Sequence, residues 1–235
     1  TTAANINTAR NNGIGASNAP QNTALLFGGN TGSETGKTEQ YNGTSWTEVS
    51  DMGTARDGLG GSGIGTSALA AGGAPPPGDV AIAEEFNTTV NTITAGAWAS
   101  GGAMNTGRGT AGDCGTYLAG LVFGGNPGNA PYADDKTEEY NGTSWSEQND
   151  MGTARFYVSG SGTQTAALAV AGRTGPGTNF AKTVVEEYDG SSWSEQNDIP
   201  TAANGMMGAG TQTAAVHFGG VSSPGGSSLT ASYEY

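Results

Sequence analysis

The chain has 235 residues, among them 42 glycines, and carries only eight Lys and Arg residues against 21 Asp and Glu residues. The resulting formal net charge of −13 argues against a nucleic-acid partner, because nucleic acids are bound by basic side chains that neutralise phosphates. A single cysteine, Cys114, excludes an intrachain disulfide framework, and the absence of a long apolar run leads us to expect no membrane insertion.

A unit of about 48 residues recurs along the whole chain. A pair of small residues after an apolar run occurs five times, first in Phe27–Gly29 and last in Phe218–Gly220. An acidic residue shortly before an aromatic one also occurs five times, first in Glu39–Tyr41 and last in Glu234–Tyr235. The third marker is a tryptophan, with four copies: Trp46, Trp98, Trp145 and Trp193. Such a repeat in sequence predicts a repeat in space.

The two ends of the chain fall within one unit. Each tryptophan is followed eight residues later by a threonine, and three of these four threonines open a Thr-Ala-Arg or Thr-Gly-Arg triplet. The first triplet begins at Thr8, so the segment Thr1–Asn7 corresponds to the residues that follow a tryptophan elsewhere. Tyr235 stands where the next Asn-Gly-Thr-Ser-Trp would begin. We therefore expect Thr1–Asn7 to supply the outer strand of the last unit.

Each unit contains four short apolar or alternating runs separated by turn residues. In the fourth unit these runs are Phe156–Gly162, Thr165–Gly172, Thr183–Tyr188 and Ser192–Gln196. Asn-Gly or Asp-Gly between the last two predicts a hairpin, because both residues tolerate positive φ. The first strands are made of small residues, which suit a narrow centre: Gly13–Ser17, Gly58–Gly65, Gly109–Gly115, Val158–Gly162 and Met206–Gly210.

Four strands per unit at this period predict an all-β fold, a single five-bladed β-propeller of four-stranded antiparallel blades closed by the N-terminal segment. The order of small pair, aromatic and tryptophan resembles the kelch repeat, although five blades are fewer than that family commonly has. The predicted blades cover residues of about 8–53, 54–105, 106–152, 153–200, and 201–235 together with 1–7.

The residues that recur in nearly every blade are predicted to be structural. A ring of arginines is also a possible anion site, but we expect each one to bind loop carbonyls or a repeated glutamate, taken as Glu39, Glu85, Glu139 and Glu187. The tryptophans suit either sugar stacking or packing between blades, and their fixed position favours packing. The recurrent arginines are Arg10, Arg56, Arg108 and Arg155.

No catalytic group is predicted. Adjacent glutamates in a strand point to opposite faces and do not share a site, and no nucleophile motif or phosphate-binding loop is present. His217, the only histidine, has no partner for zinc and is expected to be buried. Asp134 and Asp135 are a possible part of a calcium site, but two adjacent carboxylates do not define one. We expect no enzymatic activity, no metal and no cofactor.

The loop between the small pair and the aromatic differs in every blade, and variable loops on a constant scaffold are typical of recognition. The longest of these loops are Asn126–Thr137 and Arg173–Thr183. Their aromatic and charged side chains are the predicted contact residues: Tyr132, Asp134, Asp135, Lys136, Arg173, Phe180 and Lys182.

The near-identical blades, with the phrases TAR, GTQTAA and EEYNGTSW, resemble propeller repeats of structural proteins from marine bacteriophages. This resemblance implies an extracellular location on the virion surface or tail, with host attachment through a protein partner or a cell-surface glycan. The alternative is a secreted, lectin-like carbohydrate-binding propeller, and a more remote one is a glycoside hydrolase.

Overall fold

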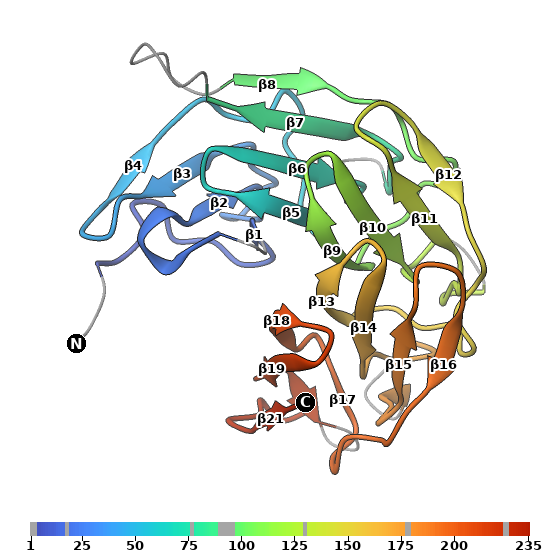
Figure 1. Ribbon diagram of the computed structural model, residues 1–235. Helices are drawn as coiled ribbons and strands as arrows, with labels where there is room; N and C mark the ends of the chain where they lie inside the picture. Colours follow the sequence, from blue (N-terminus) through green and yellow to red (C-terminus); the bar gives the residue numbers. More distant parts are fainter. Residues whose placement is uncertain are drawn as a thin grey trace.

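The computed structural model describes residues 4–16, 19–75, 78–88, 97–128, 131–176, 180–222 and 226–235. Strands account for nearly all regular structure in these residues, and η1 (Gln21–Thr23) is a short 3₁₀ turn. The strands form five antiparallel blades arranged around an axis (Figure 1), so the prediction of a five-bladed propeller is confirmed.

The strands of each blade follow chain order from the axis outward. Blade 1 contains β1 (Ile14–Gly15), β2 (Leu25–Phe27), β3 (Thr38–Tyr41) and β4 (Trp46–Glu48). Blade 2 contains β5 (Gly60–Ile64), β6 (Ser67–Ala71), β7 (Ala83–Asn87) and β8 (Ala97–Ser100). Blade 3 contains β9 (Gly112–Thr116), β10 (Ala119–Phe123), β11 (Thr137–Tyr140) and β12 (Trp145–Glu147).

Blade 4 contains β13 (Ser159–Thr163), β14 (Ala166–Val170), β15 (Val185–Tyr188) and β16 (Trp193–Glu195). Blade 5 has three described strands, β18 (Met207–Thr211), β19 (Ala214–Phe218) and β21 (Ser232–Glu234). A small separate sheet pairs β17 (Ala203–Asn204) with β20 (Val221–Ser222) at the entrance to this blade.

The turn before each outer strand is fixed by its first side chain. Asn141 Oδ1 accepts hydrogen bonds from the backbone N–H groups of Thr143 and Ser144, both at 3.0 Å, and Asn42 and Asp189 make the same pair of bonds. Gly142 follows with a φ of 89°, a conformation that residues with a side chain rarely adopt. The Asn-Gly-Thr-Ser-Trp phrase therefore encodes a tight hairpin, as predicted.

The core lies between neighbouring blades as four apolar layers. Between blades 3 and 4, for example, Leu121 and Phe123 of β10 pack with Ala167 and Ala169 of β14, and all four are fully buried. The inner strands pack side by side in the order β1, β5, β9, β13 and β18. Glycine and alanine on one blade give room for the larger aliphatic and aromatic side chains of the preceding blade.

A buried ion pair holds each of the first four blades. Arg155 Nη2 lies 2.7 Å from Glu186 Oε1, and its Nη1 donates to the carbonyls of Ala171 (2.6 Å) and Val184 (2.8 Å). Glu186 Oε2 accepts the N–H of Gly152, in the segment that crosses over from the preceding blade. The other pairs are Arg10–Glu39, Arg56–Glu84 and Arg108–Glu138.

Three of the expected glutamate partners were therefore wrong by one residue. Glu85, Glu139 and Glu187 lie on the opposite face of the same strands, because successive side chains of a strand alternate. There they reach the next blade, where each accepts a hydrogen bond from a tyrosine hydroxyl: that of Tyr140, Tyr188 or Tyr235.

The described part of the N-terminal segment binds blade 1. Trp46 Nε1 donates to the carbonyl of Ala4 at 3.2 Å, and Asn7 Nδ2 donates to the carbonyl of Trp46 at 2.9 Å. Residues 102–105 make the same contacts with Trp145 when the chain passes from blade 2 to blade 3. Residues 4–7 are thus a crossover into blade 1, and the prediction that they form the outer strand of blade 5 is wrong. Residues 1–3 lie outside the described residues.

His217 is buried in blade 5 and faces blade 4. Its Nδ1 lies 2.8 Å from Ser159 Oγ and its Nε2 lies 3.2 Å from Ser161 Oγ, so both ring nitrogens have hydroxyl partners. Burial lowers the pKa of His217 to about 4, which keeps the ring neutral near pH 7. The histidine is an interblade contact, in agreement with its expected burial. No helix in the described residues is long and apolar enough to span a membrane.

Candidate functional site at the channel mouth

One end of the axis is bordered by a row of backbone hydrogen bonds that links the five blades. Each blade contributes the residue two positions after the arginine of its triplet, or after Ala203 in blade 5, and from blade 2 onward the N–H of this residue donates to the carbonyl of the preceding blade's residue. The bonds are Gly58 N to Asn12 O (3.4 Å), Thr110 N to Gly58 O (2.8 Å), Tyr157 N to Thr110 O (2.8 Å) and Gly205 N to Tyr157 O (2.9 Å).

All five residues of this mouth ring adopt the left-handed conformation. Thr110 and Tyr157 both have a φ of 54°, which is uncommon for residues with a side chain and rare for a β-branched one. The cost of such a conformation is of order 1–3 kcal/mol per residue, and it persists where neighbouring structure imposes it. Here the interblade bonds impose the backbone, so the side chain at this position is free to differ between blades: Asn, Gly, Thr, Tyr and Gly.

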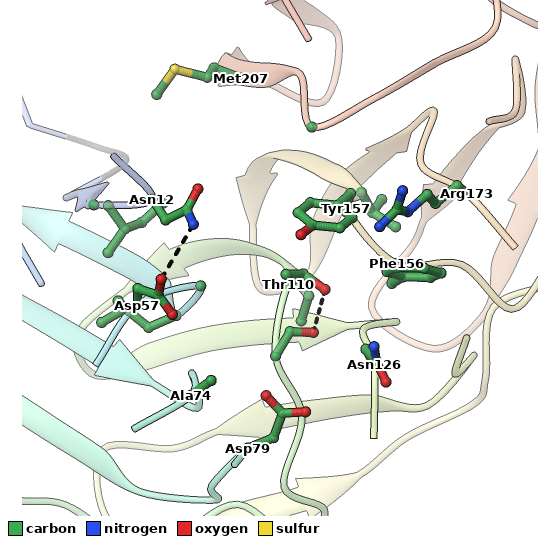
Figure 2. A pocket seen from close by; sticks show the side chains of 18 of the residues that line it. Asn12, Asp57, Ala74, Asp79, Thr110, Asn126, Phe156, Tyr157, Arg173 and Met207 are labelled. Atoms are coloured by element: carbon green, nitrogen blue, oxygen red, sulfur yellow. Dashed lines mark hydrogen bonds between the residues drawn. The ribbon is translucent and has the colours of Figure 1, made fainter. Parts of the chain in front are cut away.

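The mouth ring borders a pocket of about 620 Å³ that residues of all five blades line (Figure 2). The variable loops begin at its rim, since isolated bridges tie Asp57 to Ala74, Gly109 to Asn126 and Phe156 to Arg173. The pocket is therefore lined both by the mouth ring and by the first residues of the variable loops.

One wall of the pocket is aromatic and cationic. The Arg173 guanidinium carbon lies 4.6 Å from the ring centroids of both Phe156 and Tyr157. Phe156 is buried, whereas Tyr157 is partly exposed and extends toward the pocket in Figure 2. These contacts hold a flat aromatic surface at the pocket wall.

The opposite wall carries the carboxylates of Asp57 and Asp79 and the amide of Asn12 (Figure 2). Asn12 Nδ2 donates to Asp57 Oδ2 at 3.3 Å. Asp79 lies against Gly109, where an added Cβ would stand 2.6 Å from Asp79 Oδ1. Burial, followed by the nearby charge of Asp57, raises the pKa of Asp79. Within the described residues no group of three or more His, Cys, Asp or Glu side chains is placed to hold a metal ion.

Below the mouth, a smaller cavity of about 210 Å³ adjoins the pocket along the axis, and Ile14, Leu59 and Val158 line both spaces. Asp113 lies in this channel and accepts the N–H of Gly61 at 3.0 Å. Burial raises its pKa to about 7. The equivalent residues of the other blades are all glycine: Gly15, Gly61, Gly160 and Gly208.

The structure disperses most of the predicted contact residues. Arg173 lines the pocket, but Tyr132 and Phe180 are each 45% exposed and lie outside its lining. Asp134 Oδ1 accepts the N–H groups of Asp135 and Lys136, and Lys136 Nζ lies 2.7 Å from Glu147.

The remaining predicted residues make contacts within the scaffold. The Lys182 N–H donates to the carbonyl of Gly172 at 2.8 Å. Trp145 Nε1 donates to Gly102 O at 2.9 Å, and Trp193 Nε1 donates to Thr137 Oγ1 at 2.9 Å while its ring packs edge-on against Phe123. Trp98 stands in β8, and its side chain lies outside the described residues.

Sequence reasoning missed the mouth ring. Asn12, Asp57, Asp79, Thr110 and Tyr157 were not among the predicted contact residues, which all belong to the two longest variable loops, 126–137 and 173–183. Asn12, Thr110 and Tyr157 stand two residues after the nearly invariant triplet, at a position that differs between most units, and this variation is their signal in the sequence. Variation next to an invariant position indicates a constrained backbone with a free side chain.

No protein-family model matches the chain, and no curated protein matches it. Among solved structures, the structure of YjhT is similar, with a TM-score of 0.76 at 13% sequence identity. The similarity covers 96% of this chain and 81% of the YjhT chain. At this identity the similarity shows the propeller fold alone.

Proposed function

We propose that this protein is a non-enzymatic binding module that takes a polyhydroxylated ligand, a cell-surface glycan, in the pocket at the channel mouth. The observation that carries the proposal is the mouth ring, in which an interblade-bonded backbone presents three different side chains, those of Asn12, Thr110 and Tyr157, and glycine from the other two blades. Strained residues that the scaffold holds in place tend to occur at functional sites. A constant frame with variable side chains is also the layout expected of a recognition surface.

The chemistry of the pocket favours a sugar over an apolar or strongly ionic ligand. Asn12, Asp57, Thr110 and Asn126 supply hydrogen-bond donors and acceptors to hydroxyl groups. Tyr157 supplies a flat aromatic surface against which the C–H face of a sugar ring can pack. A few placed polar groups beside an aromatic wall are typical of small-ligand sites.

The proposed setting is the virion surface or tail of a bacteriophage, where the propeller mediates host attachment. The kelch-like order of markers and the resemblance of the blades to phage structural proteins support this setting. The alternative is a secreted lectin-like propeller, which would use the same pocket. Labelling of purified particles by an antibody against this chain distinguishes the two, since a secreted lectin leaves particles unlabelled.

Glycan binding is expected to depend on the mouth ring. We expect Tyr157→Asn to weaken binding on a glycan array, confirmed by titration calorimetry, at least tenfold, which corresponds to about 1.4 kcal/mol. Asparagine tolerates the left-handed conformation, and blade 1 already carries Asn12 at this position, so the fold is retained. The matched control is Tyr132→Ala, which removes an exposed tyrosine outside the pocket and should leave affinity unchanged.

Equal affinities for the wild-type protein and the folded Tyr157→Asn variant would contradict the proposed site. Loss of binding in Tyr132→Ala alone would move recognition to the tip of the loop 126–137. Release of sugar from a bound glycan by the wild-type protein would favour the hydrolase alternative, and Asp57 and Asp79 would then be the first carboxylates to replace.

A further inference from the structure

Neighbouring blades share a pair of side chains that changes as a unit. At three interfaces a tyrosine hydroxyl donates to a glutamate of the preceding blade, as in Tyr188 to Glu139 (3.1 Å) and Tyr235 to Glu187 (3.0 Å). At the interface of blades 1 and 2 both members differ, because Phe86 has no hydroxyl and Gln40 donates to the carbonyl of Gly65 instead. A tyrosine in one blade therefore occurs with a glutamate in the preceding blade, and a phenylalanine occurs with a glutamine.

In the described part of the chain, the first and last blades each carry one unpaired member of this tyrosine–glutamate pair: Tyr41 in blade 1 and Glu234 in blade 5. Glu234 pairs with Val216 in the way that Glu187 pairs with Leu168, so it faces away from blade 4. Glu234 is exposed, and Tyr41 of blade 1 is partly exposed, whereas Tyr140 and Tyr188 at the same position are buried. Blade 5 thus offers an acceptor and blade 1 offers a donor toward the sector between them.

The apolar layer is also incomplete there. Phe218 of blade 5 is 42% exposed, although Phe27 and Phe123 at the same repeat position are fully buried against the next blade. Met207, its partner across the β18–β19 ladder, is exposed as well. On the other side, Leu26 of blade 1 is only partly buried. Figure 1 shows the sector between blades 5 and 1 as the open part of the ring.

The crossover segment supplies the third observation. Residues 4–7 bind blade 1 in the way that residues 102–105 bind blade 3, and residues 102–105 come directly from the outer strand β8. In Figure 1 the segment enters from the side of the open sector. The crossover is therefore positioned to receive chain from the outer strand of a blade that occupies this sector.

We propose that the open edge, formed by Met207, Phe218 and Glu234 of blade 5 and by Leu26 and Tyr41 of blade 1, binds one further blade of this repeat. The added blade would present a tyrosine to Glu234 and a glutamate to Tyr41, and would cover both apolar faces.

The test adds such a blade to the full chain. A copy of residues 153–193 placed before Thr1 keeps the register, because Trp193 precedes Thr201 by eight residues as the new tryptophan would precede Thr8. We expect the extended chain to remain monomeric and its Tm to rise by roughly 5 °C or more. Hydrogen exchange at Leu26 and Phe218 should slow. A matched extension carrying Glu187→Ala and Tyr188→Phe in the added copy should raise the Tm by less, because it cannot form the two tyrosine–glutamate hydrogen bonds.

A second measurement uses the chain without an extension. If the edge is open, Tyr41→Phe and Glu234→Gln have additive effects on Tm, because the two side chains do not meet. Strong non-additivity would show that blades 1 and 5 close directly on each other and would overturn the proposal. An extended chain with unchanged Tm and a protease-sensitive added segment would also overturn it, as would a wild-type dimer whose interface protects Phe218.

Discussion

Replacing Arg56 with alanine is expected to destabilise the protein by about 3–5 kcal/mol, because it leaves a buried carboxylate without its cation. Arg56 is fully buried and pairs with Glu84, and its Nε donates to the carbonyl of Gly72 at 2.8 Å. Glu84 keeps only the N–H groups of Gly53 and Thr54 in the variant. These two hydrogen bonds hold the crossover from blade 1 against blade 2, so we expect the substitution to weaken the contact between these blades as well.

Thermal unfolding measures the effect, with Lys37→Ala as the matched control. Lys37 and Glu48 form a 2.8 Å pair in blade 1, but both side chains are more than one third exposed. An exposed pair contributes about 0–1 kcal/mol, so this variant should unfold near the wild-type temperature. At 2–4 °C per kcal/mol for a chain of this size, Arg56→Ala should lower Tm by roughly 10 °C. Full stability together with lost ligand binding would mean that the arginines form the site.

Blade 5 supplies a natural counterpart to this experiment. Ala203 stands where the other blades have arginine, and Tyr233 stands where they have the paired glutamate. Ala203 is buried and Tyr233 packs against the same apolar layer. Replacing both members of a buried pair by apolar groups is often neutral. The double variant Arg56→Ala, Glu84→Tyr should therefore be more stable than Arg56→Ala alone.

The repeat made the fold predictable, because a period of about 48 residues with four apolar runs admits few architectures. The predicted inner strands Gly58–Gly65 and Gly109–Gly115 overlap β5 and β9, and the Asn-Gly hairpins stand where expected. Each of these features depends on residues within one unit. Local turn chemistry and strand alternation determine them before any contact between blades is known.

The errors arose where contacts between blades decide the outcome. Two adjacent glutamates point to opposite faces of a strand, and the sequence of one blade does not say which face meets the arginine. Comparison across the units does: blade 1 has only the first glutamate, Glu39, and blade 5 lacks the arginine and the first glutamate together but keeps the second, Glu234. Residues 4–7 were misplaced for a similar reason, since position in the repeat did not separate an outer strand from the crossover that follows it.

The left-handed backbone of the mouth ring could not be predicted from the sequence, for a different reason. A threonine and a tyrosine at positive φ contradict local propensity, and only the interblade bonds to Gly58, Thr110 and Tyr157 carbonyls make that conformation hold. Positions where local preference and tertiary structure disagree are often functional. The channel contains a second unexpected residue: blade 3 carries Asp113 at a position that is glycine in every other blade.

That carboxylate gives the second large expected effect: Asp113→Asn should stabilise the protein at pH 8 and have little effect at pH 4. The unfolded carboxyl group loses its proton near its ordinary pKa of about 4, whereas burial raises the folded pKa of Asp113 to about 7. Between these values the unfolded state binds fewer protons, so stability falls as pH rises through this interval. Asparagine keeps an oxygen to accept the Gly61 N–H but carries no charge.

A shift of about three pKa units corresponds to roughly 4 kcal/mol, and contact of Asp113 with the channel cavity reduces the expected gain to about 2–4 kcal/mol. Denaturant unfolding at pH 4 and pH 8 measures it, with the exposed Glu195→Gln as the control that should change neither value. An equal gain at both pH values would show that charge is not the cause. A residue that costs stability at neutral pH is retained where function needs it. We therefore expect the stabilised Asp113→Asn protein to bind its glycan more weakly, because the channel opens into the pocket at the mouth.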